Sequence, residues 1–338
     1  MRQVWIPKIG GPDVLEVREA PDPTPQAGQV RIRTAGAGLN FADVMARMGL
    51  YPDAPKLPTV VGYEVSGEVD AVGAGVQHFK AGDRVVALTR FGGHSDVVCV
   101  AENQAFHLPG NLETRDGAAV PVNYLTAWLM LVRLGNVQPG ERVLVHAAAG
   151  GVGLAALQIC KLRGAEVIGT ASGGKHARLK DEGVAHCIDY TREDFEQAVM
   201  SYTKGRGVDI VLDAVGGESL KKGYRCLAPL GRLFIFGASS FAPEKKRSLV
   251  AAVKGILSSP IFLPMPLMDK NRGVFGVNLG HLWDHTEMLG ASMKEILSHF
   301  ESGEFTAMVD KAFPFAEAAK AHEYIQDRKN FGKVLLVP

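Results

Sequence analysis

The stretch VLVHAAAGGVGLAALQ, residues 143–158, decides the fold that this chain can adopt. A short β-type run of apolar residues leads into a glycine-rich turn, and an apolar stretch of helical length follows the turn. This order predicts a strand, a tight turn and a helix, which together open a dinucleotide-binding unit. Ala148 stands where the pattern G-x-G-x-x-G has its first glycine, so the motif alone also fits a plain packing turn.

The turn has the residues that a bound pyrophosphate requires. Gly150 permits a tight backbone, Gly153 lets the helix pack closely on the strand, and the helix begins near Gly151. The first amides of that helix and the positive end of its dipole then face an anion. The predicted cofactor-binding residues of the turn are Ala149, Gly150, Gly151, Val152 and Gly153.

Strands and helices alternate on the C-terminal side of this turn. The β-type runs occupy residues 166–171, 186–190, 208–216 and 232–239, and the helix-type runs occupy residues 153–164, 175–183 and 194–205. Such alternation predicts βαβ units and a doubly wound parallel sheet. Ligands bind at the carboxyl ends of the strands in an open parallel sheet. The predicted cofactor-binding residues at these ends are Val215, Gly216, Phe236, Gly237, Ala238 and Ser239.

The rest of the chain has a different sequence pattern. Residues 1–120 contain short β-type runs separated by glycine and proline, which is typical of a barrel-like or sandwich-like β domain. The last third combines a long amphipathic helix-type stretch with short β-type runs that end in KVLLVP. We therefore predict an α/β protein of two domains. Residues 1–122 and 272–338 form the β domain, and residues 123–271 form the parallel-sheet domain.

The residues after the second strand of the parallel sheet predict the cofactor. A dinucleotide-binding unit often has an acidic residue there, about 20 residues after the glycine turn, which holds the ribose hydroxyls. Ser172 and Lys175 occupy this place, so no carboxylate repels a 2′-phosphate and a lysine can contact it. We predict NADP(H) rather than NAD(H). In the alternative interpretation, Lys175 and Arg178 only solvate a helix face.

The composition argues against several classes of protein. The 338 residues include 46% hydrophobic and 22% charged residues with a formal net charge of +1, so no basic surface for nucleic acid is predicted. Four dispersed cysteines without a C-x-x-C pair indicate neither a disulfide framework nor a zinc lobe. The N-terminal residues do not match the pattern of a secretion signal, so we expect a cytoplasmic protein.

The segment of residues 241–270, FAPEKKRSLVAAVKGILSSPIFLPMPLMDK, has a pattern that fits several roles. A basic patch, Lys245, Lys246 and Arg247, precedes apolar residues that Lys254 and three prolines interrupt, so the run is too short to span a bilayer. The composition is compatible with an interfacial anchor, a lid over a substrate, a dimer contact or a buried interdomain segment.

Motifs along nearly the whole chain resemble one family. NFADVMARMGLY, AGDRVVAL, NYLTAW, LVHAAAGGVG, GTASGGKHARLK, CIDY, VDIVLDAVGG and GKVLLVP look like the medium-chain dehydrogenase/reductase superfamily, in its zinc-independent quinone oxidoreductase branch. Within that branch, VNYLTAWLMLVRLGNVQPGERVLVHAAAGGVG and GTASGGKHARLKDEGVAHCIDY look most like the vesicle amine transport protein homologues.

The resemblance implies both a fold and an activity. The fold is a GroES-like β domain that a Rossmann domain interrupts, and the activity is reduction of a quinone or an α,β-unsaturated carbonyl by NADPH. A homodimer formed through the edge strand of the Rossmann sheet, near residues 232–236, is also implied. The likeness to vesicle proteins leaves open a nucleotide-binding protein that contacts a membrane or a protein partner and has little turnover.

Four candidate catalytic residues follow from the resemblance. Asn40, Asp43 and Tyr51 match the stretch that lines the active cleft in the quinone oxidoreductases. A Tyr or Asn in that place can steady the negative charge that hydride transfer puts on an oxygen of the substrate. Asn40 and Asp43 fit equally well as the cap of the helix that they begin. Tyr63 departs from the usual pattern of the branch and is the fourth candidate.

Three further cofactor contacts are implied by the same resemblance. Tyr190 matches a tyrosine that packs beside the 2′-phosphate, together with the lysine that Lys175 matches. Thr126 falls on the helix that faces the nicotinamide. Asn330 matches a position that reaches back to the cofactor, although a plain turn residue would also fit there.

A catalytic zinc ion has no predicted set of ligands. Such a site requires about three Cys, His or acidic side chains that converge on the metal. Compared with zinc-dependent relatives, the chain has Asn40 near the place of the cysteine and Gly62, Tyr63 and Glu64 in place of Gly-His-Glu. We therefore predict no metal, and we interpret His94, His107 and His146 as core or surface histidines.

Metal content tests this prediction directly. Because the ligand set is missing, elemental analysis of the purified protein should find less than stoichiometric zinc, and a chelator should leave the activity unchanged. One tightly bound zinc ion per chain would contradict the prediction.

Overall fold

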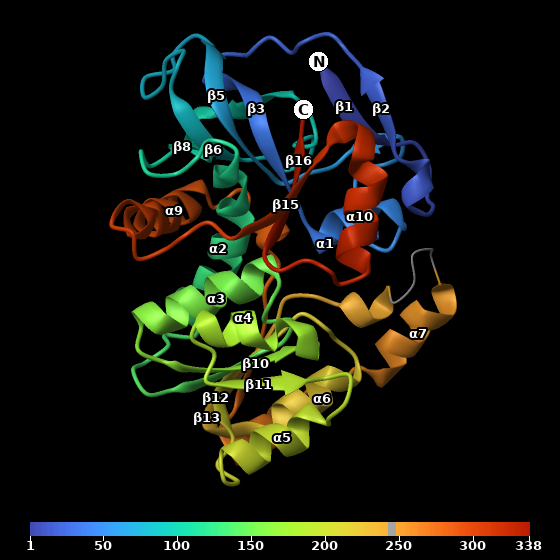
Figure 1. The fold of residues 1–338 in the computed structure, drawn as a ribbon, viewed down its shortest axis with the longest axis vertical. Helices are drawn as coiled ribbons and strands as arrows, with labels where there is room; N and C mark the ends of the chain where they lie inside the picture. The colour runs from blue at the N-terminus through green and yellow to red at the C-terminus, as the bar shows by residue number, and fades with distance from the viewer. Residues whose placement is uncertain (243–247) are drawn as a thin grey trace. The chain divides into compact units, whose positions relative to one another are not determined.

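The computed structural model describes residues 1–242 and 248–338, so the predicted basic patch at residues 245–247 lies outside the described residues. The chain divides into two compact units (Figure 1). Unit 1 contains residues 1–125 and 279–338, and unit 2 contains residues 126–242 and 248–278. The insertion of one unit into the sequence of the other agrees with the predicted arrangement of a GroES-like and a Rossmann domain.

Unit 1 consists of two β-sheets with helices beside them. The larger sheet has the order β15-β16-β3-β5-β6-β8, with β7 paired to β3, and the smaller sheet has the order β2-β1-β4. Its strands are β1 (Arg2–Ile6), β2 (Glu16–Glu19), β3 (Gln29–Leu39), β4 (Thr59–Val60), β5 (Glu64–Val72), β6 (Arg84–Leu88), β7 (Val97–Ala101), β8 (Ala105–His107), β15 (Val309–Pro314) and β16 (Lys333–Val337). Its helices are α1 (Phe41–Arg47), α9 (Thr286–Glu301) and α10 (Ala318–Gln326).

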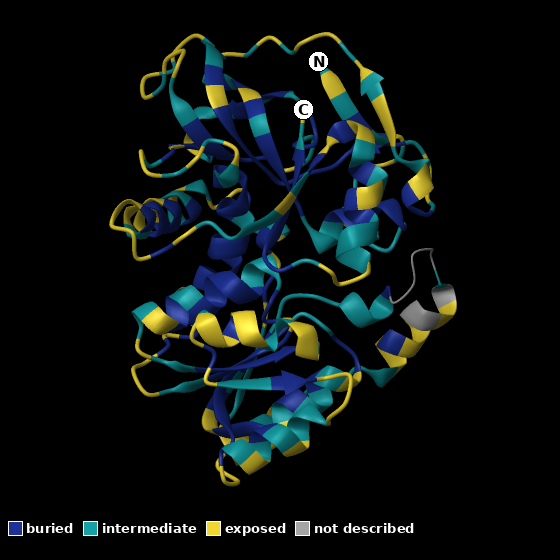
Figure 2. Cartoon of the chain, in the orientation of Figure 1, coloured by how far each residue is buried: buried dark blue, intermediate teal, exposed yellow. Residues whose placement is uncertain are grey.

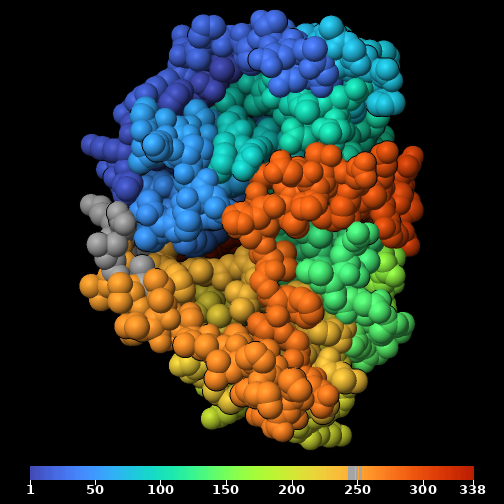
Figure 3. All heavy atoms as spheres, turned by 180° about the vertical axis from the view of Figure 1, so that it is seen from behind, coloured from blue at the N-terminus to red at the C-terminus, as the bar shows by residue number. Residues whose placement is uncertain are grey.

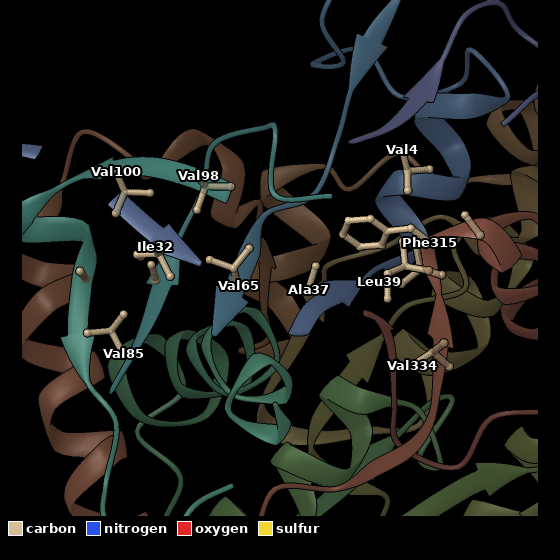
Figure 4. Close-up of a cluster of buried hydrophobic side chains, with 14 of the residues drawn as sticks. Val4, Ile32, Ala37, Leu39, Val65, Val85, Val98, Val100, Phe315 and Val334 are labelled. Atoms are coloured by element: carbon tan, nitrogen blue, oxygen red, sulfur yellow. The ribbon is translucent and has the colours of Figure 1, made fainter. Parts of the chain in front are cut away.

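The core of unit 1 explains why these strands form. Burial alternates along β1 and the first half of β3, whereas β6 and β16 are rich in aliphatic residues and are buried on both faces. Figure 4 shows the resulting cluster, in which Val98 and Val100 of β7 lie beside Ile32 of β3, and Phe315 lies beside Leu39 at the other end of β3. Ile32 and Val98 come from directly paired positions of β3 and β7, and Val334 brings β16 into the same cluster.

Unit 2 is a six-stranded parallel sheet with the order β11-β10-β9-β12-β13-β14. Its strands are β9 (Arg142–Val145), β10 (Glu166–Ala171), β11 (His186–Asp189), β12 (Val208–Asp213), β13 (Leu227–Ile235) and β14 (Gly273–Gly276). Its helices are α3 (Gly151–Leu162), α4 (His176–Asp181), α5 (Phe195–Tyr202), α6 (Glu218–Arg225), α7 (Leu249–Ser258) and α8 (Pro264–Lys270). In Figure 1, α3 and α4 lie on one side of the sheet, and α5 and α6 lie on the other.

This strand order places the reversal of the sheet between β9 and β12. The chain moves outward from β9 to β10 and β11, and it then returns to β12 and continues to β13 and β14. Ligands of open parallel sheets bind at such a reversal, beyond the carboxyl ends of the strands. The predicted doubly wound sheet is therefore confirmed.

The strand β14 corrects two predictions. It pairs with β13 from Arg232 to Ile235, so the stretch near residues 232–236 is not the edge of the sheet. It also belongs to unit 2, which extends to Asn278, so the predicted boundary at 271/272 comes too early. The other boundary between the two units falls within α2 (Pro121–Trp128), a few residues after the predicted 122/123 boundary. The sequence GVFG contains two glycines and no strand alternation, which explains the omission.

One helical stretch of the described residues is long and apolar enough to cross a membrane. It runs from Asp116 to Leu134 and combines a 3₁₀ turn, α2 and a π-helix (Leu129–Leu134). In its most apolar window, 78% of the residues are buried inside the protein. Such burial is typical of a core helix, and Trp128, Leu125 and Met130 are among the largest fully buried side chains.

In contrast to this buried helical stretch, the segment of helices α7 and α8 exposes apolar side chains to solvent. Eight large apolar side chains of this segment are each more than half exposed: Val250, Val253, Ile256, Leu257, Ile261, Leu263, Met265 and Met268. Figure 2 shows exposed residues along α7, and Figure 3 shows atoms of the segment, in orange, at the molecular surface. One of the four predicted roles was a buried interdomain segment, and the exposure of these side chains does not fit that role.

Candidate functional site

The turn between β9 and α3 leads into a helix that begins at the predicted residue. Gly150 is the N-cap of α3, the helix begins at Gly151, and Gly150 contributes no side chain that could cap the first amides. A Cβ atom on Gly153 would lie 2.5 Å from the carbonyl oxygen of Ala148, so only glycine lets the helix approach the strand this closely. The left-handed residue of the turn is Ala147, with φ of 53°, rather than Gly150.

The carboxyl ends of β12 and β13 are held together by backbone hydrogen bonds. The buried Asp213 carboxylate accepts from the amides of Val215 and Gly216, at 2.7 and 2.8 Å. The amide of Phe236 donates to the Asp213 carbonyl, and the amide of Ser239 donates to the Ala214 carbonyl. Within unit 2, the structure thus brings the predicted residues 215–216 and 236–239 to one edge of the sheet.

The turn after β10 contains the residues predicted to select the cofactor. Ser172 follows the strand, and Lys175 ends a 3₁₀ turn in which its amide donates to the Ser172 carbonyl at 3.0 Å. Tyr190 is exposed directly after β11, the strand that pairs with β10. The three predicted residues therefore lie at the carboxyl ends of two neighbouring strands.

An acidic residue that the sequence analysis did not consider lies beside this turn. Asp189 ends β11, and its carboxylate accepts from the Thr191 hydroxyl at 2.6 Å and from the Gly173 amide. Hydrogen bonds from Thr191, Gly173 and the charge of Arg192 hold the pKa of Asp189 below its usual value. The run CIDY in the sequence could have indicated Asp189, because neighbouring parallel strands end at the same edge of a sheet and the end of this strand lies beside the end of its neighbour.

Thr126 and Asn330 are the two predicted contacts outside these turns. Thr126 is a nearly buried residue of α2, at the first position of unit 2. Asn330 lies in unit 1, and its side-chain amide donates to the Gly332 carbonyl at 2.9 Å. This bond within the turn before β16 matches the plain turn residue that the sequence also allowed.

A cavity of about 350 Å³ lies in unit 1. Tyr51 and Tyr63, two of the predicted catalytic residues, line it together. The other lining residues are Asp53, Arg90, Phe91, Gly280, His281, Trp283 and Asp284. The sequence analysis missed these residues because they come from separate segments of the chain without a local motif.

Asn40 and Asp43 belong instead to a buried polar network. The Asp43 carboxylate accepts from the amide of Asn40 at 2.8 Å and from the amide of Gly62 at 3.1 Å. The Asn40 side-chain amide donates to the Glu64 carboxylate at 3.1 Å, and the ammonium of Lys333 donates to the Asn40 side-chain oxygen at 2.6 Å. These contacts correspond to the helix-cap interpretation, and neither residue lines the cavity.

The Lys333 ammonium is the charge at the centre of this network. It lies 2.5 Å from the Glu64 carboxylate, and both side chains are almost fully buried. The second Glu64 oxygen accepts from the amide of Val122 at 2.7 Å. The pair therefore connects the strands β16 and β5 to the beginning of α2.

Burial also determines the protonation of the neighbouring groups. It raises the pKa of Asp43 to about 7, although the amides of Asn40 and Gly62 stabilise the charged form. It lowers the pKa of His94 to about 4, so this histidine is neutral at pH 7 and lies 3.7 Å from the Asp43 carboxylate. Among the described residues, no three His, Cys, Asp or Glu side chains are grouped so that they could hold a metal ion.

The two units define the class of the protein. The family model described as "Alcohol dehydrogenase GroES-like domain" matches residues 26–117, and the one described as "Zinc-binding dehydrogenase" matches residues 182–336. The chain therefore belongs to the medium-chain dehydrogenase/reductase family of oxidoreductases. The word zinc in the second description belongs to the family model.

Within the family, the chain is similar to two groups of proteins. The human synaptic vesicle membrane protein VAT-1 homolog is 40% identical over 100% of this chain and 86% of its own length. The quinone oxidoreductase of Pseudomonas aeruginosa is 36% identical over 100% of this chain and 99% of its own length. The structure of the Escherichia coli quinone oxidoreductase complexed with NADPH aligns with a TM-score of 0.88, at 31% identity and full coverage of both chains.

The Lys333–Glu64 pair yields a prediction about stability. Lys333→Met leaves the buried Glu64 carboxylate without its cation, so it should reduce the free energy of unfolding by roughly 3–5 kcal/mol in urea denaturation. The double variant Lys333→Met/Glu64→Gln should recover most of this loss because it removes both charges.

An exposed pair at the start of α10 provides the control. Lys320 pairs with Glu317 at 2.7 Å in solvent, so Lys320→Met should cost less than about 1 kcal/mol. If Lys333→Met were as mild as Lys320→Met, the pair would not have the structural role that we assign to it.

Proposed function

We propose that this protein is an NADPH-dependent reductase that transfers hydride to a quinone or an α,β-unsaturated carbonyl without a metal ion. The observation that carries the proposal is the N-terminus of α3, where the N-cap Gly150 has no capping side chain and where Gly153, in the first turn of the helix, lies against the Ala148 carbonyl. Helix amides at the reversal of a parallel sheet suit a pyrophosphate. A bound nicotinamide would supply the hydride.

The residues around the sheet edge fit NADP(H) in particular. Gly150, Gly151 and Gly153 would hold the pyrophosphate, and Ser172 and Lys175 would contact the 2′-phosphate with Tyr190 beside it. The backbones at 215–216 and 236–239 would line the rest of the cofactor. The complex of the Escherichia coli quinone oxidoreductase with NADPH supports this cofactor for a chain of the same fold.

The cavity of unit 1 supports the choice of substrate chemistry. Hydride transfer to a quinone or enone puts negative charge on an oxygen, and a hydroxyl donor lowers the energy of that charge. Tyr51 and Tyr63 line the cavity and would act as these donors. Asn40 would act indirectly, because Glu64 and Lys333 already engage its side chain.

A second function is favoured by the exposed apolar side chains of α7 and α8. A nucleotide-binding protein that contacts a membrane or a protein partner, with little turnover, would use such a surface. The word membrane in the names of the VAT-1 homologues is consistent with this alternative. Mixing the protein with NADPH and a panel of quinones and enones, while following nicotinamide absorbance, separates the two functions. A homodimer and a cytoplasmic location stay predictions.

The choice of cofactor is testable by titration. NADPH should bind more tightly than NADH, and Lys175→Ala should reduce this difference by roughly 1–3 kcal/mol because it removes a charge-assisted contact. Lys180→Ala is the matched control, since Lys180 is an exposed residue of the following helix. Equal affinity of the unchanged protein for both nucleotides would contradict the prediction.

The two cavity tyrosines are testable by kinetics. Tyr51→Phe or Tyr63→Phe should lower kcat by up to about 10²-fold with little change in NADPH affinity, because the donor acts as charge appears on the substrate. Tyr202→Phe, on α5 of unit 2, should be neutral. If neither cavity variant slows turnover of any good acceptor, the cavity contributes no donor to the reaction.

A further inference from the structure

The turn that follows β12 is held by a buried carboxylate. One oxygen of Asp213, Oδ1, accepts from the amides of Val215 and Gly216 at 2.7 and 2.8 Å. The other oxygen, Oδ2, accepts from the Ser219 hydroxyl in the first turn of α6 at 2.7 Å. Gly216 and Gly217 have positive φ values of 79° and 62°, which glycine adopts without strain. The carboxylate therefore selects one conformation from the many that two adjacent glycines allow.

The turn that follows β13 is attached to this first turn. The amide of Ser239 donates to the Ala214 carbonyl at 3.1 Å, and the amide of Ser240 donates to the Val215 carbonyl at 2.9 Å. Both carbonyls belong to the segment that the Asp213 carboxylate orients. One side chain thus determines where the backbone lies at the carboxyl ends of two neighbouring parallel strands.

The order of the strands assigns these two turns to one half of a dinucleotide. Ser172 and Lys175 follow β10, which pairs with β9 on one side, and the pyrophosphate turn follows β9 itself. The strands β12 and β13 continue the sheet on the other side of β9. A dinucleotide with its 2′-phosphate at β10 and its pyrophosphate at β9 would therefore have its nicotinamide half at the ends of β12 and β13.

His146 connects the carboxylate to the pyrophosphate turn. Its amide donates to the Leu212 carbonyl at 3.0 Å, and its Nε2 atom lies 4.0 Å from Oδ2 of Asp213. Its Nδ1 atom lies 3.1 Å from the hydroxyl of Thr170 on β10. Because His146 directly precedes Ala147, the turns after β9 and β12 start from adjacent positions of one buried network.

We propose that Asp213 is a positioning residue for the nicotinamide half of the cofactor. Its carboxylate contacts backbone amides, and it acts by fixing the two turns against which the nicotinamide riboside would lie. The inference rests on the proposed NADPH-dependent function and adds a residue that the glycine-rich turn and the turn after β10 do not include. A backbone that is ordered in advance binds a ligand more tightly, because the binding step no longer includes the cost of ordering it. Loss of the carboxylate should therefore weaken binding of the whole dinucleotide but not of its adenosine half.

Two ligands separate the two halves of the cofactor. NADPH contains both halves, whereas 2′,5′-ADP has the adenosine and the 2′-phosphate but no nicotinamide. In calorimetric titrations, Asp213→Ala should raise the Kd of NADPH by about tenfold, because the amides of Val215 and Gly216 lose their acceptor, and should change the Kd of 2′,5′-ADP by less than about twofold. Asp213→Asn keeps an oxygen that can accept from both amides, so it should retain most of the affinity for NADPH.

Asp209 provides the matched control on the same strand. It is buried at the amino end of β12, opposite the ligand-binding edge, and its carboxylate accepts from the Arg142 amide at 2.8 Å. Asp209→Ala should lower the stability of the protein as Asp213→Ala does, and it should leave both affinities unchanged.

A second variant serves if Asp213→Ala does not fold by circular dichroism. Ser219→Ala removes the donor that orients the carboxylate, so it should raise the Kd of NADPH alone by about threefold. Ser219→Thr keeps a hydroxyl group and should retain the affinity.

The outcomes separate this inference from the proposed function. A loss of affinity for NADPH alone supports the positioning role, and it does so even if no acceptor is reduced, which would overturn only the reductase function. Equal losses for NADPH and 2′,5′-ADP, or no loss for either, would overturn the positioning role, while reduction of a quinone or enone by the unchanged protein would still support the reductase. An equal loss for NADPH in Asp209→Ala would also overturn the positioning role. Failure of the unchanged protein to bind NADPH would overturn both.

Discussion

Unit 1 depends on one buried ion pair, that between Lys333 and Glu64. A buried charge pair is stable only when further hydrogen bonds satisfy the remaining donors and acceptors. Here Asn40 and Val122 supply such bonds to the lysine and the glutamate. The pair thereby connects the last strand of the chain, β16, to β5, to the first turn of α1 and to the start of α2. Elements that are distant in sequence are held in one arrangement by this contact.

The polar residues of NFADVMARMGLY and GYE form two groups, of which one belongs to the network around this pair. Asn40 and Asp43 lie in the network, where their hydrogen bonds serve the backbone and the buried charges. Tyr51 and Tyr63 lie in the cavity. Glu64 is the first residue of β5 and forms the ion pair, whereas Tyr63 directly precedes the strand and lines the cavity.

Local pattern was sufficient to predict much of the fold. The strand at residues 166–171 was predicted with the observed bounds, and the start of α3 near Gly151 was also predicted, because apolar periodicity and glycine placement act within one element. The strand β14 was missed because four residues with two glycines have no periodicity. The cavity was only partly predictable. Tyr51 came from a family motif, but Trp283 reaches Tyr63 through tertiary packing that no local pattern reports.

The surroundings of Tyr63 restrict what its hydroxyl can contribute to the proposed reaction. Burial raises the pKa of Tyr63, and the nearby charge of Asp43 raises it further. A phenol with a raised pKa keeps its proton throughout the physiological range, so it can donate a hydrogen bond to a developing oxyanion but is a poor acid. The proton that completes reduction of an enone would then come from water. The buried tyrosine thus favours charge stabilisation over proton transfer, which suits acceptors whose reduced oxygen is a more stable anion than an enolate, as in a quinone.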